Sequence, residues 1–440
     1  MTSLSTLRDM ISQTYLVDTH EHLLEEGTRL LGAGGHPKVP CTDAALLFHH
    51  YADNDLHSSG MPRADRVRLY APDVAPAAKW ALLAPYWPRI RSTGYVQAVR
   101  RTVRILFGED DMNEGSFIRI SEQMQSDVKP GWYRYVFERA NIASCQVNSF
   151  EAIFCESAQP DLLLQDLSIT ACTVDLRLDL LEAATGIAPT TLDAMETVQD
   201  ELFTRYAHRA VAVKSQSAYS RRLNYEPTSK DAAEPIFPRI VRGEQVEPGE
   251  RKLVQDYLMH RALGLATRHR LPVKLHCGYY AGNDAMPLAR VSQNAADLCP
   301  ILAAYPDTTF VLMHIGYPYQ DEYIALAKQF RNVHIDLCWA WIINPMATVR
   351  FVREFLVAAP ASKLFTFGGD YGNVEPIVGH ADIARQGLAQ ALSDLVESGW
   401  MPLDEAIELI APLMHGNAER VFKLTINGPL APTDAISATP

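Results

Sequence analysis

Residues 16–22 read LVDTHEH, and this stretch decides the fold. It opens on apolar and β-branched residues, as a buried strand does, and it closes on two histidines, His20 and His22. Because side chains alternate along a strand, residues two apart point to the same face. We therefore expect His20 and His22 to lie side by side at the carboxyl end of a first buried strand.

Similar runs recur along the chain, and helical patterns separate most of them. The expected strands cover residues 16–22, 142–147, 169–176, 210–215, 272–277, 309–315, 332–337 and 364–370. The expected helices cover residues 192–208, 250–268, 291–305, 321–330, 347–357 and 381–397. This alternation predicts an α/β fold, a (β/α)₈ TIM barrel. A doubly wound open sheet is the alternative, but no G-x-G-x-x-G motif follows the first strand.

The spacing is irregular after the first strand. Residues 23–140 are too many for one connecting helix, and they show helical patterns rich in aromatic residues and proline. We interpret them as a helical lid inserted after strand 1 into a single domain that spans residues 1–440. Loops at this position lie over the active site of a barrel. Residues 218–249 form a second, polar elaboration, and residues 428–440 have the composition of a loose C-terminal tail.

Composition excludes several classes of protein. The chain has 440 residues, 48% hydrophobic and 21% charged, and a net charge of −12, which disfavours nucleic-acid binding. No run approaches the roughly 18 apolar residues of a membrane span, and the first residues lack the pattern of a signal peptide. The seven cysteines are odd in number and form no C-x-x-C motif, which indicates reduced thiols. We expect a cytoplasmic protein with a small-molecule partner, no nucleic acid and no membrane.

Polar side chains stand at the ends of four further expected strands: Lys214, His276, His314 and Asp370. A barrel brings the carboxyl ends of its strands together, and barrel active sites are built there. Imidazoles with a carboxylate suit Zn²⁺, and also Mn²⁺, Fe²⁺ or Co²⁺. An open metal site lowers the pKa of bound water towards about 7, and a nearby carboxylate can relay its proton.

The order of these residues resembles the amidohydrolase superfamily of metal-dependent barrels. Several segments are similar to its amidohydrolase family 2 branch: DTHEH at 18–22, KLHCG at 274–278, MHIG at 313–316, FGGD at 367–370 and AIELIAPLMHGNAERVFKL at 406–424. The long insertion resembles that of uronate isomerases. Residues 214–223, KSQSAYSRRL, are similar to a stretch of amidohydrolase-like domains fused to glutamine synthetase-type proteins.

The resemblance implies a catalytic divalent metal, with Zn²⁺ the first choice, bound by His20, His22, His276 and Asp370. It also implies that Asp370 shuttles the proton of the attacking water. Superfamily members are often dimers or larger, so we expect a homo-oligomer.

Two further residues take family roles that depend on the number of metals. His314 matches the histidine that binds a second metal in binuclear members and orients substrate or water in mononuclear ones. Lys214 matches the lysine that is carboxylated and bridges two metals in binuclear members. Many family 2 members use one metal, so we expect one ion, or two if Lys214 is carboxylated. An uncarboxylated Lys214 is cationic and would suit a substrate carboxylate.

These inferences predict a metal-dependent hydrolase that acts on a small-molecule amide, lactone or related C–N or C–O bond. Metal-activated water would attack the carbonyl carbon, Asp370 would relay the proton, and His314 with Lys214 would stabilise the oxyanion. A uronate-isomerase-like isomerase or a non-oxidative decarboxylase on the same metal site is the first alternative. A non-catalytic metal-binding barrel is the second.

A few other residues are candidates for substrate binding. Tyr219, Arg221 and Arg222 follow the fourth expected strand, where arginines could clamp an anionic group or simply be solvated. His49 lies in the expected lid and could contact substrate, although helix-surface histidines are common. His334 has no counterpart among the family's ligands, so we interpret it as structural.

Overall fold

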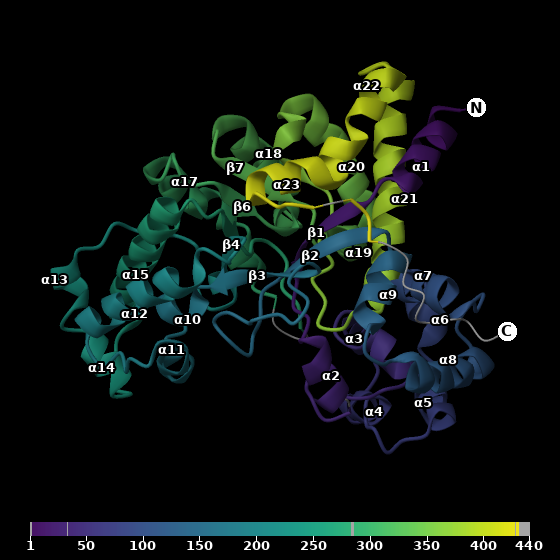
Figure 1. Cartoon of the computed structure of the whole chain (residues 1–440), viewed down its shortest axis with the longest axis horizontal. Helices are drawn as coiled ribbons and strands as arrows, with labels where there is room; N and C mark the ends of the chain where they lie inside the picture. Colours follow the sequence, from purple (N-terminus) through teal and green to yellow (C-terminus); the bar gives the residue numbers. More distant parts are fainter. Residues whose placement is uncertain (1, 33, 283–285, 427, 431–440) are drawn as a thin grey trace.

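Eight parallel strands form the centre of the computed structural model, which describes residues 2–32, 34–282, 286–426 and 428–430 (Figure 1). Each strand pairs with the next in chain order, which is the topology of the predicted (β/α)₈ TIM barrel. The strands are β1 (Leu16–Glu21), β2 (Ile142–Val147), β3 (Leu163–Ser168), β4 (Ala212–Ser215), β5 (Val273–Leu275), β6 (Phe310–Leu312), β7 (Val333–Asp336) and β8 (Leu364–Phe365).

Backbone hydrogen bonds join β1 to the segment that follows β8. The backbone nitrogen of Asp370 donates to the carbonyl of His20 at 2.9 Å, and that of His22 donates to the carbonyl of Tyr371 at 2.9 Å. These bonds bring the two ends of the sheet together. They also place Asp370 directly beside the two histidines of β1.

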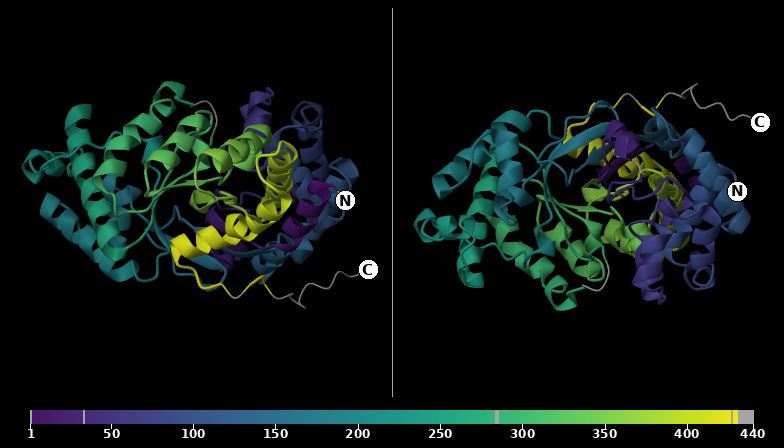
Figure 2. Two further views of the ribbon diagram at one scale, coloured as in Figure 1. Left: turned by 90° about the horizontal axis from the view of Figure 1, so that it is seen from above. Right: turned by 90° about the horizontal axis from the view of Figure 1, so that it is seen from below.

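Helices cover the outside of the barrel, as Figure 2 shows from two sides. Their amino ends carry ordinary start signals: Thr191 and Asn344 cap two helices with their side chains, and Pro248 is the first residue of a third. The helices that match the expected ones are α12 (Leu192–Tyr206), α15 (Pro248–His269), α17 (Asn294–Ala304), α18 (Gln320–Gln329), α20 (Pro345–Ala358) and α21 (Pro376–Glu397).

The third strand differs from the prediction. We expected it at residues 169–176, but β3 occupies Leu163–Ser168, and Thr170–Thr173 form the short helix α10. The sequence of β3 is LLQDLS, in which a glutamine and an aspartate interrupt the apolar run. Asp166 is nevertheless buried, because the ammonium of Lys274 on β5 compensates its charge.

The segment between β1 and β2 is mostly helical and lies to one side of the barrel, at the lower right of Figure 1. Within it, α7 packs along α21, where a Cβ at Gly379 would lie only 1.9 Å from the carbonyl oxygen of Ala98. The interpretation of residues 23–140 as a lid stays a prediction. The segment contains α2 (Glu26–Gly32), η1 (Ala44–Phe48), α3 (Ala52–Ser58), α4 (Arg63–Leu69), α5 (Pro76–Leu83), α6 (Trp87–Ile90), α7 (Gly94–Phe107), α8 (Glu114–Asp127) and α9 (Trp132–Arg139).

The inside of the barrel is layered, with apolar residues at the amino-terminal end. Val17, Ala212, Val311 and Phe365 pack there against Phe422 of α23 (Asn417–Phe422). These side chains come from four different strands, so the layer closes the bottom of the barrel.

A polar layer follows, contributed by the odd-numbered strands. Lys274 of β5 donates to both carboxylate oxygens of Asp166 on β3, at 2.8 and 3.0 Å, and to the carbonyl of Thr19 on β1, at 2.7 Å. The hydroxyl of Thr19 donates to Asp336 of β7 at 2.7 Å. All four residues are buried; Lys274 compensates the charge of Asp166, and Asp336 accepts from the hydroxyl of Thr19.

Two parts of the sequence interpretation concern the ends of the chain and membranes. Residues 431–440 of the expected tail (428–440) lie outside the described residues, so that interpretation stays a prediction. Among the helices that the structure describes, none is long and apolar enough to span a bilayer.

Candidate metal centre

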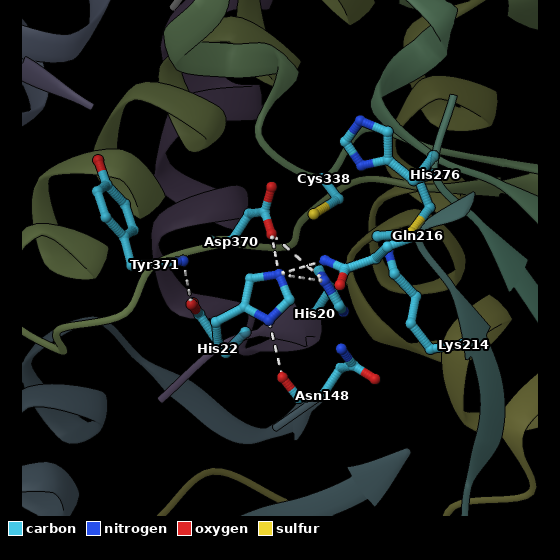
Figure 3. A network of polar contacts seen from close by, with 12 residues as sticks. His20, His22, Asn148, Lys214, Gln216, His276, Cys338, Asp370 and Tyr371 are labelled. Atoms are coloured by element: carbon cyan, nitrogen blue, oxygen red, sulfur yellow. Dashed lines mark hydrogen bonds and ion pairs between the residues drawn. The ribbon is translucent and has the colours of Figure 1, made fainter. Parts of the chain in front are cut away.

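His20, His22 and Asp370 meet at the carboxyl end of β1 (Figure 3). The two Nε2 atoms are 3.3 Å apart, and Oδ1 of Asp370 lies 3.3 Å from Nε2 of His20 and 3.2 Å from Nε2 of His22. All three residues are buried. Strand alternation therefore has the predicted result for the two histidines, and the segment after β8 adds the carboxylate.

The chemistry of these donors fits a cation. Nδ1 of His22 donates to the carbonyl of Asn148 at 2.7 Å, so Nε2 faces the cluster and, in this tautomer, carries the lone pair. That lone pair faces a carboxylate oxygen and a second imidazole, and the amide of Gln216 supplies one donor at 3.2 Å. A histidine whose other nitrogen donates to a carbonyl is the usual arrangement of a metal ligand. The three residues thus suit a divalent metal ion.

Asp370 is held in an unusual backbone conformation. Its φ is +63°, a left-handed value that is uncommon for non-glycine residues and that often marks functional sites. The hydroxyl of Tyr51 donates to its carbonyl at 2.5 Å, and Glu21 accepts from the backbone nitrogen of Tyr371 at 2.6 Å. Gly369 leaves room for Glu21, because a Cβ at this position would lie 1.9 Å from Oε1 of Glu21 and the carboxylate would have to shift.

Burial and neighbouring charges set the protonation states of the cluster. Burial lowers the pKa of His20 to about 3, and the positive charge of Lys214 acts in the same direction. Burial alone would raise the pKa of Asp370, but its close contacts with the imidazoles of His20 and His22 outweigh burial and hold the pKa well below its usual value. The site therefore presents a neutral imidazole and a carboxylate, which are the forms that bind metal.

His276, which the sequence predicts as a ligand, is not among the three residues whose donor atoms meet, and its role as a ligand stays a prediction. Its Nε2 donates to the carbonyl of Tyr279 at 2.9 Å, within the tight turn that follows β5. Its Nδ1 faces Nε2 of His314 at 3.0 Å. The structure therefore pairs the histidines of β5 and β6 with each other and leaves three residues in the first cluster.

His314 stands in a constrained turn directly after β6, with a φ of +59°. Its Nδ1 donates to the carbonyl of Cys338 at 2.9 Å, and its Nε2 lies 3.9 Å from Oδ2 of Asp370. Burial lowers the pKa of His314 to about 4. The neutral ring therefore directs a lone pair towards His276 and Asp370, and His314 is not among the residues that line the cavity described below.

Lys214 is fully buried on β4, and burial lowers its pKa. Its ammonium contacts the sulfur of Met313 at 2.6 Å, and it forms no ion pair with any residue that the structure describes. Lys214 is not among the residues that line the cavity. This conformation therefore does not provide the direct contact with a substrate carboxylate or oxyanion that the sequence predicts.

A cavity of about 340 Å³ opens onto the cluster. The ring of Phe150 stacks on that of His22 at 4.0 Å, and the ring of Tyr219 lies 4.6 Å from that of His276. A second cavity of about 600 Å³ lies next to it and shares His50 and Ala281 with it. The first cavity is lined by His22, His50, Tyr51, Phe150, Asp175, Gln216, Tyr219, Ser220, His276, Ala281 and Asp370.

The four candidate substrate contacts separate into two groups. Tyr219 lines the first cavity, and His49 lines the second. Arg221 and Arg222 line neither cavity, and the arginine clamp stays a prediction. In the structure, carboxylates of the protein itself contact both guanidinium groups. Each forms an ion pair of 2.6 Å with a barrel helix, to Asp256 of α15 and to Asp297 of α17 respectively.

Several residues of the site were not among the sequence candidates. Strand alternation could have indicated Gln216 and Cys338. Gln216 lies two residues after the inward-facing Lys214, and Cys338 lies two residues after the inward-facing Asp336. Tyr51 and Phe150 had none, because they come from the insertion and from the loop after β2, whose positions depend on tertiary packing.

Comparisons with known proteins agree with this geometry. Protein fluG of Emericella nidulans is 27% identical over 232 residues, which are 50% of this chain and 26% of fluG. A uronate isomerase of Cutibacterium acnes is 25% identical over 259 residues, 56% of this chain and 54% of that protein. The chain thus matches only about a quarter and about half of the length of these two relatives.

A solved structure shows the same fold over nearly the whole chain. The glucuronate isomerase of Caulobacter crescentus superposes with a TM-score of 0.76 and 17% identity, covering 96% of this chain and 94% of that one. The amidohydrolase family model matches residues 182–424, more than half of the chain, and this span contains Lys214, His276, His314 and Asp370. The chain therefore belongs to the amidohydrolase family.

Proposed function

We propose that this chain is a metal-dependent hydrolase that cleaves an uncharged amide, lactone or related bond of a small molecule. One observation carries the proposal: Asp370 faces both histidines of β1 and also lines the cavity, so one carboxylate reaches the metal ligands and the substrate space. Among the described residues that line this cavity, none is a lysine or an arginine. A neutral reacting group is therefore better matched than an anionic one.

The residues divide the work as follows. A divalent ion held by His20, His22 and Asp370, Zn²⁺ in our proposal, supplies a Lewis acid that makes water more acidic and polarises a carbonyl. Asp370 accepts the proton of the attacking water and passes it to the leaving group. Gln216 offers an amide N–H to a substrate oxygen, and the rings of Phe150 and Tyr219 flank the substrate.

Isomerisation of an acidic sugar is the second candidate, because a uronate isomerase is among the relatives and a glucuronate isomerase shares the fold. A uronate carries a carboxylate that needs a cationic or multiple hydrogen-bonding partner. The described lining of the first cavity supplies no cation, which favours hydrolysis, whereas Arg63 and Arg66 line the adjoining cavity. The small-molecule partner, the cytoplasmic location and the homo-oligomeric state remain predictions.

The experiment uses zinc-loaded protein, a panel of N-acyl amides and lactones, and glucuronate, in water enriched in ¹⁸O. We expect turnover of at least one amide or lactone with one ¹⁸O atom in the acid product, and loss of turnover in Asp370→Asn. Conversion of glucuronate to a ketose, and no hydrolysis in the panel, would replace the proposal with the isomerase.

A further inference from the structure

Cys338 lies next to the candidate metal centre, two residues after the end of β7, and it is fully buried. In Figure 3 its sulfur points towards the carboxylate of Asp370. One ligand atom each from His314, Cys338 and Asp370 lies within 4.8 Å of the other two. The thiol is thus part of a compact group of three donors beside the first cluster.

The two oxygens of Asp370 face different partners. Oδ1 lies 3.3 and 3.2 Å from the Nε2 atoms of His20 and His22, whereas Oδ2 lies 3.9 Å from Nε2 of His314. A carboxylate placed in this way can give one oxygen to each of two neighbouring ions.

The pair of His276 and His314 gives a second, independent observation. His314 uses its Nδ1–H on the carbonyl of Cys338, and His276 uses its Nε2–H on the carbonyl of Tyr279. When both rings are neutral, the two remaining nitrogens, 3.0 Å apart, carry lone pairs that point at each other. Facing lone pairs repel unless a cation or a proton lies between or beside them.

We propose that His314, Cys338 and Asp370 form a second metal position, adjacent to the one formed by His20, His22 and Asp370. This inference rests on the metal centre of the proposed function and adds a thiolate ligand to it. It differs from the carboxylated lysine that the resemblance implies for a second ion. Neither metal position of this arrangement uses Lys214.

The donor set defines which ions fit. A thiolate, an imidazole and a carboxylate together suit Zn²⁺ or Co²⁺ and disfavour Mg²⁺ and Ca²⁺, which prefer oxygen ligands. Binding converts the thiol of Cys338 to a thiolate and releases its proton to solvent. The competing arrangement has one ion only, with the ammonium of Lys214 as the second positive charge near Asp370.

The test is a titration of metal-stripped full-length protein with Co²⁺, followed by near-ultraviolet absorption and by metal analysis after removal of free ion. We expect the first equivalent to give only the visible bands of a nitrogen and oxygen site. The second equivalent should add thiolate-to-cobalt charge-transfer absorption. In Cys338→Ser this absorption should disappear, and the second ion should bind at least about tenfold more weakly.

Cys172→Ser is the matched control, because Cys172 is also a buried free thiol but sits in α10, outside both donor groups. It should keep the absorption. Binding of a single Co²⁺ by the wild type, or a charge-transfer band that survives in both Cys338→Ser and Cys338→Ala, would overturn the proposal. Hydrolysis by a one-ion protein would still leave the proposed function standing, so the two failures are distinguishable.

Discussion

Two polar regions lie inside the barrel and differ in how their charges are compensated. In the middle layer, Lys274 donates to both oxygens of Asp166 and to the carbonyl of Thr19. Lys214 is the Cα partner of Lys274 in the pairing of β4 with β5 and is equally buried, yet its contact is the sulfur of Met313. Neighbouring strands therefore carry one lysine that forms an ion pair and one that forms none with the residues that the structure describes.

The same contrast holds for the acceptors. At the carboxyl end of the strands, His22 and His314 each donate Nδ1–H to a backbone carbonyl. Their Nε2 lone pairs then face Asp370. A buried network whose donors and acceptors match is complete without a ligand. Convergent acceptors without enough donors need a cation, because uncompensated buried polar groups are costly. The layer around Lys274 is therefore structural, and the region around Asp370 is the one that binds a cation.

The largest expected effect comes from Asp370→Asn. Asparagine tolerates the left-handed backbone, so the metal-free fold should be retained. The lost carboxylate should lower kcat/KM on the best substrate of the panel by about 10³-fold or more, and it should reduce bound zinc. Kinetics and metal analysis on the same preparation check this. If Asp370→Asn kept both wild-type activity and wild-type zinc content, Asp370 would be neither the ligand nor the proton relay that distinguishes the binding region.

A matched pair of lysine variants separates the two regions by stability. Lys274→Met leaves the buried carboxylate of Asp166 without its cation and should lower the free energy of unfolding by about 3–5 kcal/mol. Lys214→Met removes an ammonium without a carboxylate partner, so it should change the free energy by no more than about 1 kcal/mol, or raise it. Urea unfolding of the metal-free proteins measures both. Equal losses would show that the two lysines are compensated alike.

Zinc should stabilise the folded protein, and this stabilisation should depend on the residues of the metal centre. At a free zinc concentration 100 times the Kd, the free energy of unfolding should rise by about 2.7 kcal/mol. The rise should vanish in Asp370→Asn and persist in Cys172→Ser. Thermal unfolding with and without a chelator provides the measurement, and a zinc response that Asp370→Asn retains would place the ion elsewhere.

His334 tests the opposite end of the barrel, where it stacks on Phe365 at 5.6 Å. Burial lowers its pKa from 6.5 to about 4. Between pH 4 and pH 6.5, His334 is therefore protonated in the unfolded chain and neutral in the folded one. This histidine therefore favours folding fully above pH 6.5, and the contribution falls as the pH drops towards 4. From pH 7 to 4.5, His334→Phe should lose about 2 kcal/mol less stability than the wild type.

The comparison with His334→Phe is made as a difference, so that other titrating groups cancel. Identical pH profiles for variant and wild type would mean that His334 is not held neutral in the folded protein. Zinc binding should be the same in both, because His334 belongs to neither donor group.

The smallest effect is expected at Gln216, which lines the cavity and donates to His22. Gln216→Ala removes one hydrogen bond, worth about 1 kcal/mol, and should raise KM up to about tenfold with zinc content unchanged. Steady-state kinetics with metal analysis separates the outcomes. A large loss of bound zinc instead would make Gln216 a structural part of the metal centre.

Sequence reasoning predicted the barrel and five of the strands within two residues at each end, because period-two runs and their helical spacers are local features. It misplaced β3, where Asp166 breaks the apolar run. That residue is tolerated inside only because Lys274, more than 100 positions away, lies opposite it. Pairings of this kind leave no local trace.

The candidate site divides in the same way. His20 and His22 followed from alternation along one strand, and Asp370 from its place after the last one. The orientation of His276 did not follow, because the carbonyl of Tyr279 captures its Nε2–H in a turn. Nor did the engagement of Arg221 and Arg222 with helices α15 and α17.

By itself, the sequence determined the number and order of the strands and which residue types end most of them, because hydrophobic periodicity and strand alternation act over a few residues. Only the tertiary structure decided which donors converge. Closure of β1 onto the segment after β8 places Asp370 between the histidines, and the packed insertion supplies Tyr51. Directions of lone pairs and compensation of buried charges are set by atoms that are remote in the chain.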